Sequence, residues 1–403
     1  MKVLHVLYQS LPQVSGSSIR SRDIMMSQKE KGLHVMAITS PFQDSIIGDA
    51  FDSIHDITYY RTSKTDINSI SDQQKSIFTR IGKFFSISTF TVALYKLAKK
   101  ERPQVIHAHA MFYCGIPSII VGKMLQIPVV YEFRSLWMFQ RKETTKNSLE
   151  KYTELVLLKI EAFALREANH AVFLNEKLRA YFIEKGYSFK KSSIINNAIN
   201  TTLIQSNTIA TSQKKNKEIV FGYIGTLTTY EGIEFLIEVF QELADQGQVF
   251  KLLLYGGGIS EDSIVQKINQ RGDLKNIVFK GRIASEKIIE AFAEIDVIVN
   301  PRLSNNVTNS VMPLKPLEAF AHKKLVLGSD VGGIKEIITD TENGLLFRAE
   351  NKESLKDKIL EISKMSSKKK DTIIHNALDY VIDNKSWIKN VENYIHLYNT
   401  LLH

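Results

Sequence analysis

Short apolar segments, each followed by a helical pattern, constrain the fold of this chain more than any other feature. In the second half these segments are 219–224, 251–255, 277–279, 297–299 and 325–327. Strands that alternate with helices form parallel sheets, because neighbouring parallel strands need a long crossover connection. We therefore predict an α/β domain with a parallel sheet in this half of the chain.

The first half contains apolar strands that end in polar residues. These segments are 3–7, 105–109 and 129–137. In open α/β sheets the carboxyl ends of the strands border the ligand crevice. His109, Glu132 and Arg134 are therefore candidate site residues. Two histidines that lie two positions apart could also bind a metal, but no carboxylate or cysteine is close to them in sequence, so we predict no metal site.

The length of the chain indicates two domains. A single ordinary domain is shorter than 403 residues, and two domains of about 200 residues each fit this length. The stretch 201–217 is polar and poor in apolar residues, so we place a linker there. The predicted domains are 1–200 and 218–384, followed by a C-terminal helix at 385–403. That helix carries one apolar stripe, which consists of Trp387, Val391, Tyr394, Tyr398 and Leu402. In the first domain, a second amphipathic helix is marked by the apolar residues Leu155, Leu158, Ala162 and Leu165.

Composition indicates a globular protein of a reducing compartment. Hydrophobic residues make up 44% and charged residues 24% of the chain, which is typical of folded proteins. The one cysteine, Cys114, excludes an internal disulfide and fits the cytoplasm. The apolar run at the N-terminus is too short for a signal peptide. The apolar stretch 110–122 ends well short of the roughly 20 residues of a membrane span, so we predict a buried helix there.

The net charge of +9 is compatible with nucleic acid, an anionic membrane or an anionic substrate as partner. The positive charge is spread along the chain and no nucleic-acid motif accompanies it, so we predict an anionic membrane surface and a phosphorylated substrate. Aromatic and basic residues at helical spacing in 75–100 fit an interfacial helix on anionic lipid. A helix that faces the protein core explains the same apolar positions.

The stretch 300–333 contains the most informative single motif. Proline is favoured at the first position of a helix, so a helix should begin near Pro316. The free amides around Leu314 and Lys315 would then face outward beside the Lys315 ammonium, which suits a phosphate or diphosphate. Glu318 in the first turn could accept hydrogen bonds from a ribose diol, or it could simply offset the helix dipole.

The segment PLKPLEAFAHKKLVLGSDVGGIKEIITDTENGLLF resembles the nucleotide-sugar signature of the retaining glycosyltransferases of family 4. This resemblance implies the GT-B fold, in which two Rossmann-like parallel-sheet domains face each other across a cleft and the C-terminal helix crosses back to the first domain. The first domain would bind the acceptor and the second the nucleotide sugar.

The resemblance also implies an activity. A sugar would pass from a nucleoside-diphosphate sugar, with UDP the preferred nucleotide, to a glycan or a polyprenyl or other lipid-linked acceptor, with retention of configuration. The enzyme would serve cell-surface polysaccharide or glycolipid synthesis on the inner face of the membrane. No D-x-D motif stands at a strand end, so neither an obligatory cation nor another cofactor is expected.

Family positions carry over to individual residues. His109 would approach the donor sugar and Glu318 the ribose, and these two are the predicted catalytic residues. Apart from the resemblance, Arg20 and Arg22 open the helix after the loop 9–18 and could meet an acceptor phosphate, or they could lie on a solvated helix face. We assign Glu132 and Arg134 to the acceptor as well. The predicted donor-binding residues are Gly16, Gly225, Thr226, Arg282, Arg302, Ser310, Leu314, Lys315 and Glu318. Gly16, at the crest of the loop 9–18, would let the backbone approach the ligand, or it could mark an ordinary turn.

The sequence departs from the family pattern at the diphosphate site. The family usually has an arginine and a lysine where this chain has Thr226 and Glu231, and a glutamate where it has Ser310. Arg302, Lys315 and Arg282 are candidate replacements for the lost cations, and we favour such compensation over loss of activity. The alternatives are a nucleotide-sugar 2-epimerase of the same fold and a catalytically silent partner subunit.

Overall fold

The structure, a computed structural model, describes residues 1–13, 15–43, 51–62, 77–139, 148–200, 219–272, 275–284 and 287–403, without the side chains of 77–85. The predicted linker 201–217 therefore lies outside the described residues. So do the side chains at the start of the basic and aromatic helix predicted at 75–100. The chain divides into two compact units: Met1–Asn196 together with Trp387–His403, and Asn197–Ser386.

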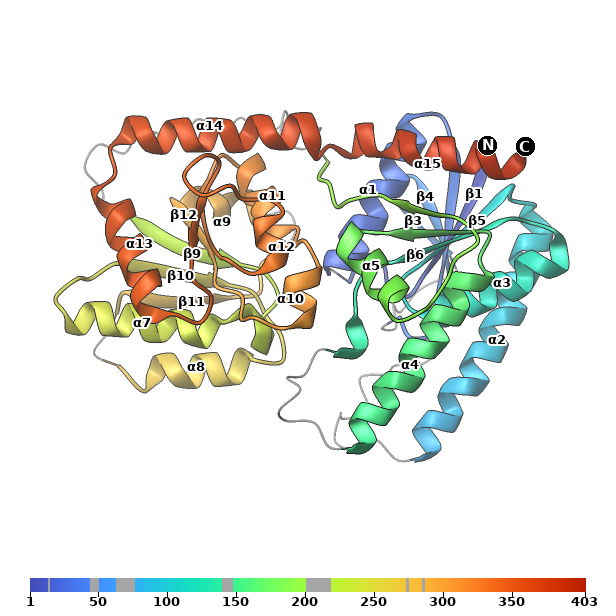
Figure 1. The fold of residues 1–403 in the computed structure, drawn as a ribbon, viewed down its shortest axis with the longest axis horizontal. Coiled ribbons are helices and arrows are strands. Elements are labelled where there is room, and N and C mark those ends of the chain that lie inside the picture. The colour runs from blue at the N-terminus through green and yellow to red at the C-terminus, as the bar shows by residue number, and fades with distance from the viewer. Residues whose placement is uncertain are drawn as a thin grey trace. The chain divides into compact units, whose positions relative to one another are not determined.

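The first unit is built on an eight-stranded sheet with the order β3-β4-β2-β1-β5-β6-β7-β8 (Figure 1). Its strands are β1 (Lys2–Leu7), β2 (His34–Thr39), β3 (Phe51–Ile54), β4 (Ile57–Arg61), β5 (Val105–His109), β6 (Val129–Phe133), β7 (His170–Phe173) and β8 (Ser192–Ile194). All neighbours pair in parallel except β3 and β4, which form an antiparallel edge. The strand predictions at 3–7 and 105–109 are confirmed.

Helices cover both faces of this sheet. They are α1 (Gly16–Glu30), α2 (Ile77–Glu101), α3 (Phe112–Leu125), α4 (Ser148–Glu167), α5 (Glu176–Glu184) and α15 (Trp387–Leu402), with a 3-10 turn η2 (Trp137–Phe139). Helices α2, α3 and α4 pack side by side, and α1 packs against α15 (Figure 1). The predicted stripe of α15 is buried from Trp387 to Tyr398, whereas Leu402 is exposed.

Two local predictions for this unit were wrong. Gly16 begins helix α1 and is not the crest of a loop, because Ser15 and Ser18 form a capping box that starts the helix there. On α4, Leu158, Ala162 and Leu165 are buried as expected, but Leu155 is 46% exposed. The predicted buried helix at 110–122 is present as α3, and eight of its residues are buried, Cys114 among them.

The second unit is built on a six-stranded parallel sheet with the order β11-β10-β9-β12-β13-β14. Its strands are β9 (Val220–Ile224), β10 (Lys251–Tyr255), β11 (Ile277–Gly281), β12 (Val297–Asn300), β13 (Leu325–Ser329) and β14 (Leu345–Phe347). The first five are the strands predicted from the sequence. Strands buried on both faces read as continuous apolar runs, which is why the signal was strong.

The helices of this unit lie in two layers. They are η4 (Thr229–Glu231), α7 (Ile233–Asp245), α8 (Glu261–Asn269), α9 (Ile288–Glu294), α10 (Asn306–Ser310), α11 (Lys315–Ala321), α12 (Gly332–Lys335), α13 (Lys352–Lys364) and α14 (Ser367–Asn384). One hydrophobic cluster joins the sheet to α7, α8 and α13, and the other joins it to α9, α11 and α14. Among the described residues, no helix combines the length and apolar character that a membrane crossing requires.

Glu161 is a buried carboxyl group in the core of the first unit. The backbone N–H of Phe112 and the indole N–H of Trp137 donate to its Oε1 at 3.0 and 2.9 Å, and the Tyr131 hydroxyl donates to Oε2 at 2.5 Å. Burial raises the pKa of Glu161 to about 7, although these donors act in the opposite direction. The carboxylate therefore caps the first turn of α3 at an electrostatic cost.

We predict that this cost makes the first unit less stable as pH rises. Between the ordinary pKa of 4.5 and the folded value of about 7, the folded state binds a proton that the unfolded state lacks. Its stability should fall by about 3 kcal/mol across that interval. Glu161→Gln should remove the dependence, because an amide can accept two of the bonds and donate the third. Both tryptophans, Trp137 and Trp387, lie in this unit, so fluorescence-detected urea unfolding reports on it.

Glu184, an exposed glutamate at the end of α5 in the same unit, provides the control, and Glu184→Gln should leave the pH dependence of unfolding as in the wild type. An unfolding midpoint of Glu161→Gln that falls with pH as steeply as that of the wild type would contradict the assignment.

Candidate functional site

Three charged side chains meet in the second unit near the carboxyl ends of β9 and β12. Glu231 ends the turn η4, Arg302 follows β12, and Lys315 is the first residue of α11. The Lys315 ammonium lies 2.7 Å from Glu231 Oε1, and Arg302 Nη2 lies 3.1 Å from the same oxygen. Glu231 therefore organises both cations, and the three groups together carry a net charge of +1.

The cluster differs in exposure from one member to the next. The side chains of Glu231 and Arg302 are 3% and 9% exposed, whereas that of Lys315 is 18% exposed. Burial alone would raise the pKa of Glu231, but Arg302 and Lys315 outweigh it and lower that pKa to about 2. Glu231 is thus a permanent anion, and Lys315 is the cation that solvent can reach.

The loop after β9 leaves room for the lysine because it contains glycine. Gly225 has φ +157°, and a Cβ placed there would lie 2.1 Å from Cε of Lys315. The ammonium also lies 5.1 Å from the centre of the Tyr223 ring, and the Tyr223 hydroxyl donates to the Thr226 carbonyl at 2.8 Å. A side chain at Gly225 would displace Lys315 from this position.

The other predicted donor residues surround this cluster or stand apart from it. Thr226 is exposed next to Gly225. Leu314 is the N-cap of α11, Glu318 lies in its first turn, and Pro316 is its second residue, so the helix begins within one residue of the prediction. Ser310 ends the short helix α10. The Arg282 side chain is 78% exposed and 3.9 Å from Glu261, so the structure does not bring it to Glu231.

A second polar cluster lies inside the first unit. Glu132 on β6 accepts hydrogen bonds from Nε of Arg20 and Nε of Arg134 at 2.9 and 2.7 Å, and from the hydroxyl of Tyr394 on α15. Burial would raise the pKa of Glu132, but the two arginines outweigh it and hold that pKa well below its usual range. Arg20, Glu132 and Arg134 are at most 6% exposed and satisfy one another. Their acceptor role stays a prediction.

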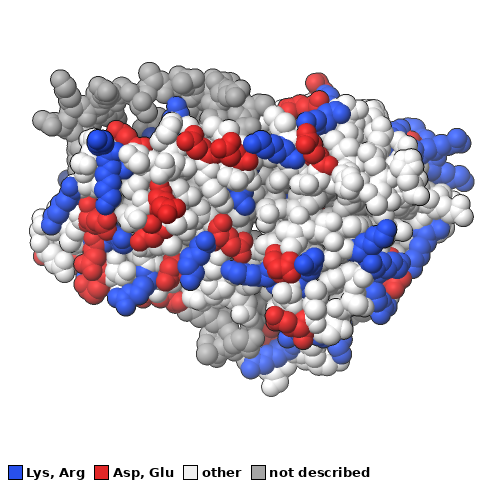
Figure 2. Space-filling view, turned by 45° about the horizontal axis from the view of Figure 1, so that its top comes forward, with Lys and Arg blue, Asp and Glu red and all other residues white. Residues whose placement is uncertain are grey.

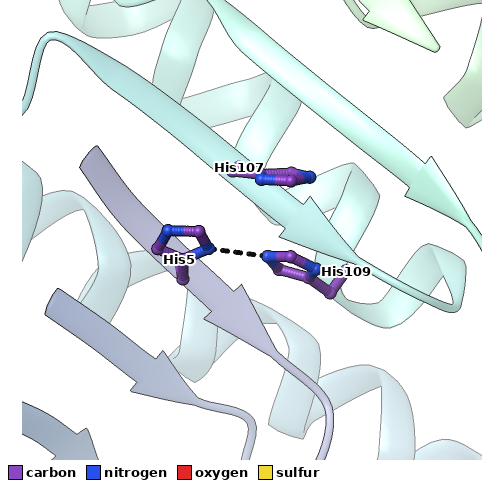
Figure 3. Close-up of side chains that lie close together, drawn as sticks. All are labelled: His5, His107 and His109. Atoms are coloured by element: carbon purple, nitrogen blue, oxygen red, sulfur yellow. Dashed lines mark hydrogen bonds between the residues drawn. The ribbon is translucent and has the colours of Figure 1, made fainter. Parts of the chain in front are cut away.

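Three histidines adjoin this ion cluster. His107 and His109 on β5 lie beside His5 of the neighbouring strand β1, and His5 Nδ1 is 2.7 Å from His109 Nε2 (Figure 3). Burial lowers the pKa of all three, to about 3 for His5 and well below the usual range for His109. The rings are therefore neutral at physiological pH. His109 is 1% exposed, and its predicted role beside the donor sugar stays a prediction.

His5 is the residue that the sequence analysis missed. It is 104 positions from His109 in sequence, and a histidine within an apolar strand gives no sign of its partner. One signal was present: a polar residue at the centre of a buried strand needs a hydrogen-bond partner.

Comparisons with known proteins agree with this architecture. The GT-B class is defined by two parallel-sheet α/β units of this kind. HepE from Anabaena in its complex with UDP-glucose has the same fold, with a TM-score of 0.69, 16% identity and coverage of 99% of this chain and 100% of that one. Residues 59–203 match the family model for glycosyltransferase family 4, and residues 205–379 match that for glycosyl transferases group 1. The two models together cover most of the chain, which is therefore a GT-B glycosyltransferase of the family 4 and group 1 type.

Curated relatives are distant in sequence. An uncharacterized glycosyltransferase of Methanocaldococcus jannaschii is 24% identical over 263 residues, which cover 64% of this chain and 64% of that protein. The match thus spans somewhat less than two thirds of this relative. The capsular polysaccharide biosynthesis glycosyltransferase CapM of Staphylococcus aureus is 22% identical over 372 residues, which cover 86% of this chain and 93% of that protein.

The three-charge cluster yields a prediction about stability. Glu231→Gln leaves two largely buried cations without a counter-charge, so the second unit should lose about 3–5 kcal/mol at neutral pH. Because the folded pKa of Glu231 is lowered from 4.5 to about 2, the difference from the wild type should be constant above 4.5 and shrink as pH falls toward 2. Calorimetry measures this, since this unit contains no tryptophan.

Glu261→Gln is the matched control, because the Glu261 side chain is 35% exposed and its ion pair with Arg282 is long, at 3.9 Å. It should change the stability by less than about 0.5 kcal/mol. Equal unfolding temperatures for Glu231→Gln and the wild type at pH 7 would show that Glu231 does not hold the two cations.

Proposed function

We propose that this chain transfers a sugar from a nucleoside-diphosphate sugar, with UDP as the preferred nucleotide, to a glycan or lipid-linked acceptor. One observation carries the proposal: Lys315 is fixed by Glu231 above Gly225, and its ammonium is the solvent-accessible cation of a cluster with net positive charge. Family membership and the UDP-glucose complex of HepE support the choice of donor.

The cluster suits the departure of a diphosphate. Breaking the sugar–phosphate bond places negative charge on the leaving oxygen, and a cation fixed beforehand stabilises that charge without reorganising. The ammonium has three N–H donors, of which Glu231 takes one, so the others can serve phosphate oxygens. Glu231 stands where the family usually has a lysine. In this proposal Glu231 preserves the cationic character of the site, because it holds Lys315 and Arg302. These two cations substitute for the arginine and lysine that the family usually has.

The remaining steps extend the family chemistry to this chain. Glu318 accepts hydrogen bonds from the ribose diol, and the main chain around Gly225 and Leu314 approaches the diphosphate. The acceptor hydroxyl then attacks the sugar on the face from which the diphosphate departs, so configuration is retained. In the first unit, the end of strand β5, which the buried His109 closes, is our candidate for the segment that approaches the sugar or the acceptor.

The biological setting follows from the same resemblance. CapM, whose name places it in capsular polysaccharide biosynthesis, aligns with most of this chain. We propose a role in surface polysaccharide or glycolipid synthesis, in the cytoplasm on the inner face of the membrane, with anionic lipid as the docking surface. The positive charge is interspersed with acidic side chains over much of the face drawn in Figure 2. We therefore expect lipid binding to be weak and sensitive to salt.

The donor site is tested by UDP binding to a lysine variant. Lys315→Met keeps the length of the side chain but removes its charge and donors, so the affinity for UDP should fall about tenfold to a hundredfold. Lys335→Met changes an exposed lysine of α12 and should bind UDP like the wild type. Isothermal titration calorimetry measures both. Undiminished affinity of Lys315→Met for UDP would overturn the proposed function.

Glu318 provides a second, independent test. Glu318→Ala should raise the KM for the donor and lower turnover, because the ribose hydroxyls lose a charged acceptor. The wild type should bind UDP about tenfold more tightly than 2′,3′-dideoxy-UDP, and the variant should not discriminate between them. If the variant keeps this discrimination, the carboxylate serves the helix dipole alone.

The epimerase alternative is tested by proton NMR of the sugar. Only an epimerase converts the donor into a second nucleotide sugar when no acceptor is present.

A further inference from the structure

A chain of hydrogen bonds runs through the core of the first unit from Arg134 to His107. Arg134 Nη2 lies 2.5 Å from His109 Nδ1, and His109 Nε2 lies 2.7 Å from His5 Nδ1. The far nitrogen of His5, Nε2, lies 2.9 Å from Gln28 Oε1. Gln28 Nε2 lies 3.0 Å from the Tyr398 hydroxyl, which is 2.7 Å from His107 Nδ1.

The direction of this chain is set by its first member. A guanidinium has donors and no acceptor, so Arg134 must donate to His109 Nδ1. The neutral ring of His109 then carries its proton on Nε2 and donates to His5. The same reasoning places the proton of His5 on Nε2, where it meets the Gln28 carbonyl oxygen.

The amide of Gln28 continues the sequence. Its carbonyl oxygen accepts from His5, so its NH₂ group faces the Tyr398 hydroxyl and donates to it. The hydroxyl proton then points to His107 Nδ1, which leaves the proton of His107 on Nε2. That nitrogen lies 3.6 Å from Glu132 Oε2, which is longer than a hydrogen bond. Reversing any step from Arg134 to Gln28 would bring two donors or two acceptors together, and reversing the last step would turn the Tyr398 hydroxyl proton away from His107 Nδ1.

A bound metal is the obvious alternative for three histidines whose ring nitrogens lie within 4.8 Å of one another. The geometry does not favour it. The rings of His107 and His109 overlap with centroids 3.9 Å apart and planes 33° apart, whereas ligands of one ion point toward a common centre (Figure 3). A ligating histidine normally donates its outer N–H to an acceptor, but His109 meets an arginine there.

Charge leads to the same conclusion. Arg20, Arg134 and Glu132 already leave this buried region with a net charge of +1, and a divalent cation would raise it to +3. Burying so much uncompensated charge is strongly unfavourable.

We propose that Gln28 and Tyr398 are positioning residues: Arg134 sets the Nε2–H tautomer of His109, and Gln28, anchored by Tyr398, holds the His5 ring that accepts from it and so fixes the end of strand β5. They link this strand end to helix α15, which supplies Tyr398. Directly after His109 the backbone passes through Ala110 and Met111, both non-glycine residues with positive φ of 42° and 60°. Such a conformation persists only where its surroundings hold it firmly, and the ordered ring of His109 is one such restraint.

The inference rests on the proposed function in one respect. If the end of β5 meets the sugar or the acceptor, His109 contributes a fixed orientation and not proton transfer, because both of its ring nitrogens are engaged and its pKa is well below the usual range. The tautomers themselves can be measured without any substrate.

The test is long-range ¹H–¹⁵N NMR of the full chain labelled at histidine nitrogens. Signals assigned with His5, His107 and His109 variants should show three Nε2–H tautomers that do not change between about pH 6 and pH 9. Tyr398→Phe removes the donor to His107 Nδ1 and the acceptor of Gln28, so the His107 signals should shift and turnover should fall about tenfold at an unchanged donor KM. Tyr394→Phe, one turn away on α15, should keep all three tautomers.

Several results would overturn the inference. An Nδ1–H tautomer at His109, or titration of any of the three rings within this pH range, would contradict the assigned order of protons. A shift of all three histidines on addition of one equivalent of Zn²⁺ would reveal a metal site instead. Wild-type turnover in Tyr398→Phe with altered His107 signals would remove the positioning role. Undiminished affinity of Lys315→Met for UDP bears on the proposed function alone, because the NMR measurement needs no nucleotide.

Discussion

The proposed donor site depends on one buried carboxylate, that of Glu231. It takes the place of a family lysine, and without the structure it looks like a loss of positive charge. In the folded chain it draws Lys315 and Arg302 together, and the two cations keep its pKa at about 2. A strong anion at this position therefore creates a preorganised cationic site. The site has lower net charge than two free cations would have, but its lysine is fixed in one position before any ligand arrives.

Both units use a glutamate to organise two cations, but with different outcomes. Around Glu132 every partner is enclosed: Arg20 and Arg134 are at most 6% exposed, and the tyrosine from α15 completes the set. Around Glu231 the lysine stays accessible, with 18% of its side chain exposed. An enclosed cluster stabilises and orients its own unit, whereas a cluster with an accessible ammonium can bind an anion. This contrast supports the assignment of the nucleotide to the second unit and of a positioning role to the polar core of the first.

Sequence reasoning succeeded where the signal was local. The strands of the second unit were predicted because they are continuous apolar runs, and Pro316 located the start of α11 within one residue. It failed where non-local geometry decides. Glu231 and Arg302 are 71 positions apart and meet only because β9 and β12 are neighbours in the sheet. His5 reaches His109 for the same reason. Gly16 was wrongly placed in a loop because Ser15 and Ser18 cap a helix that begins there. Leu155 was wrongly expected to be buried because helical periodicity does not say which face of the helix a neighbouring element covers.

A crystal structure of the chain with bound UDP would test the central claim most directly. We predict a pyrophosphate oxygen within about 3 Å of Lys315 Nζ, with Glu231 still bound to Arg302 and the main chain of Gly225 alongside the phosphates. A nucleotide bound elsewhere, or a pyrophosphate that makes no contact with Lys315 while the ammonium remains on Glu231, would contradict the account.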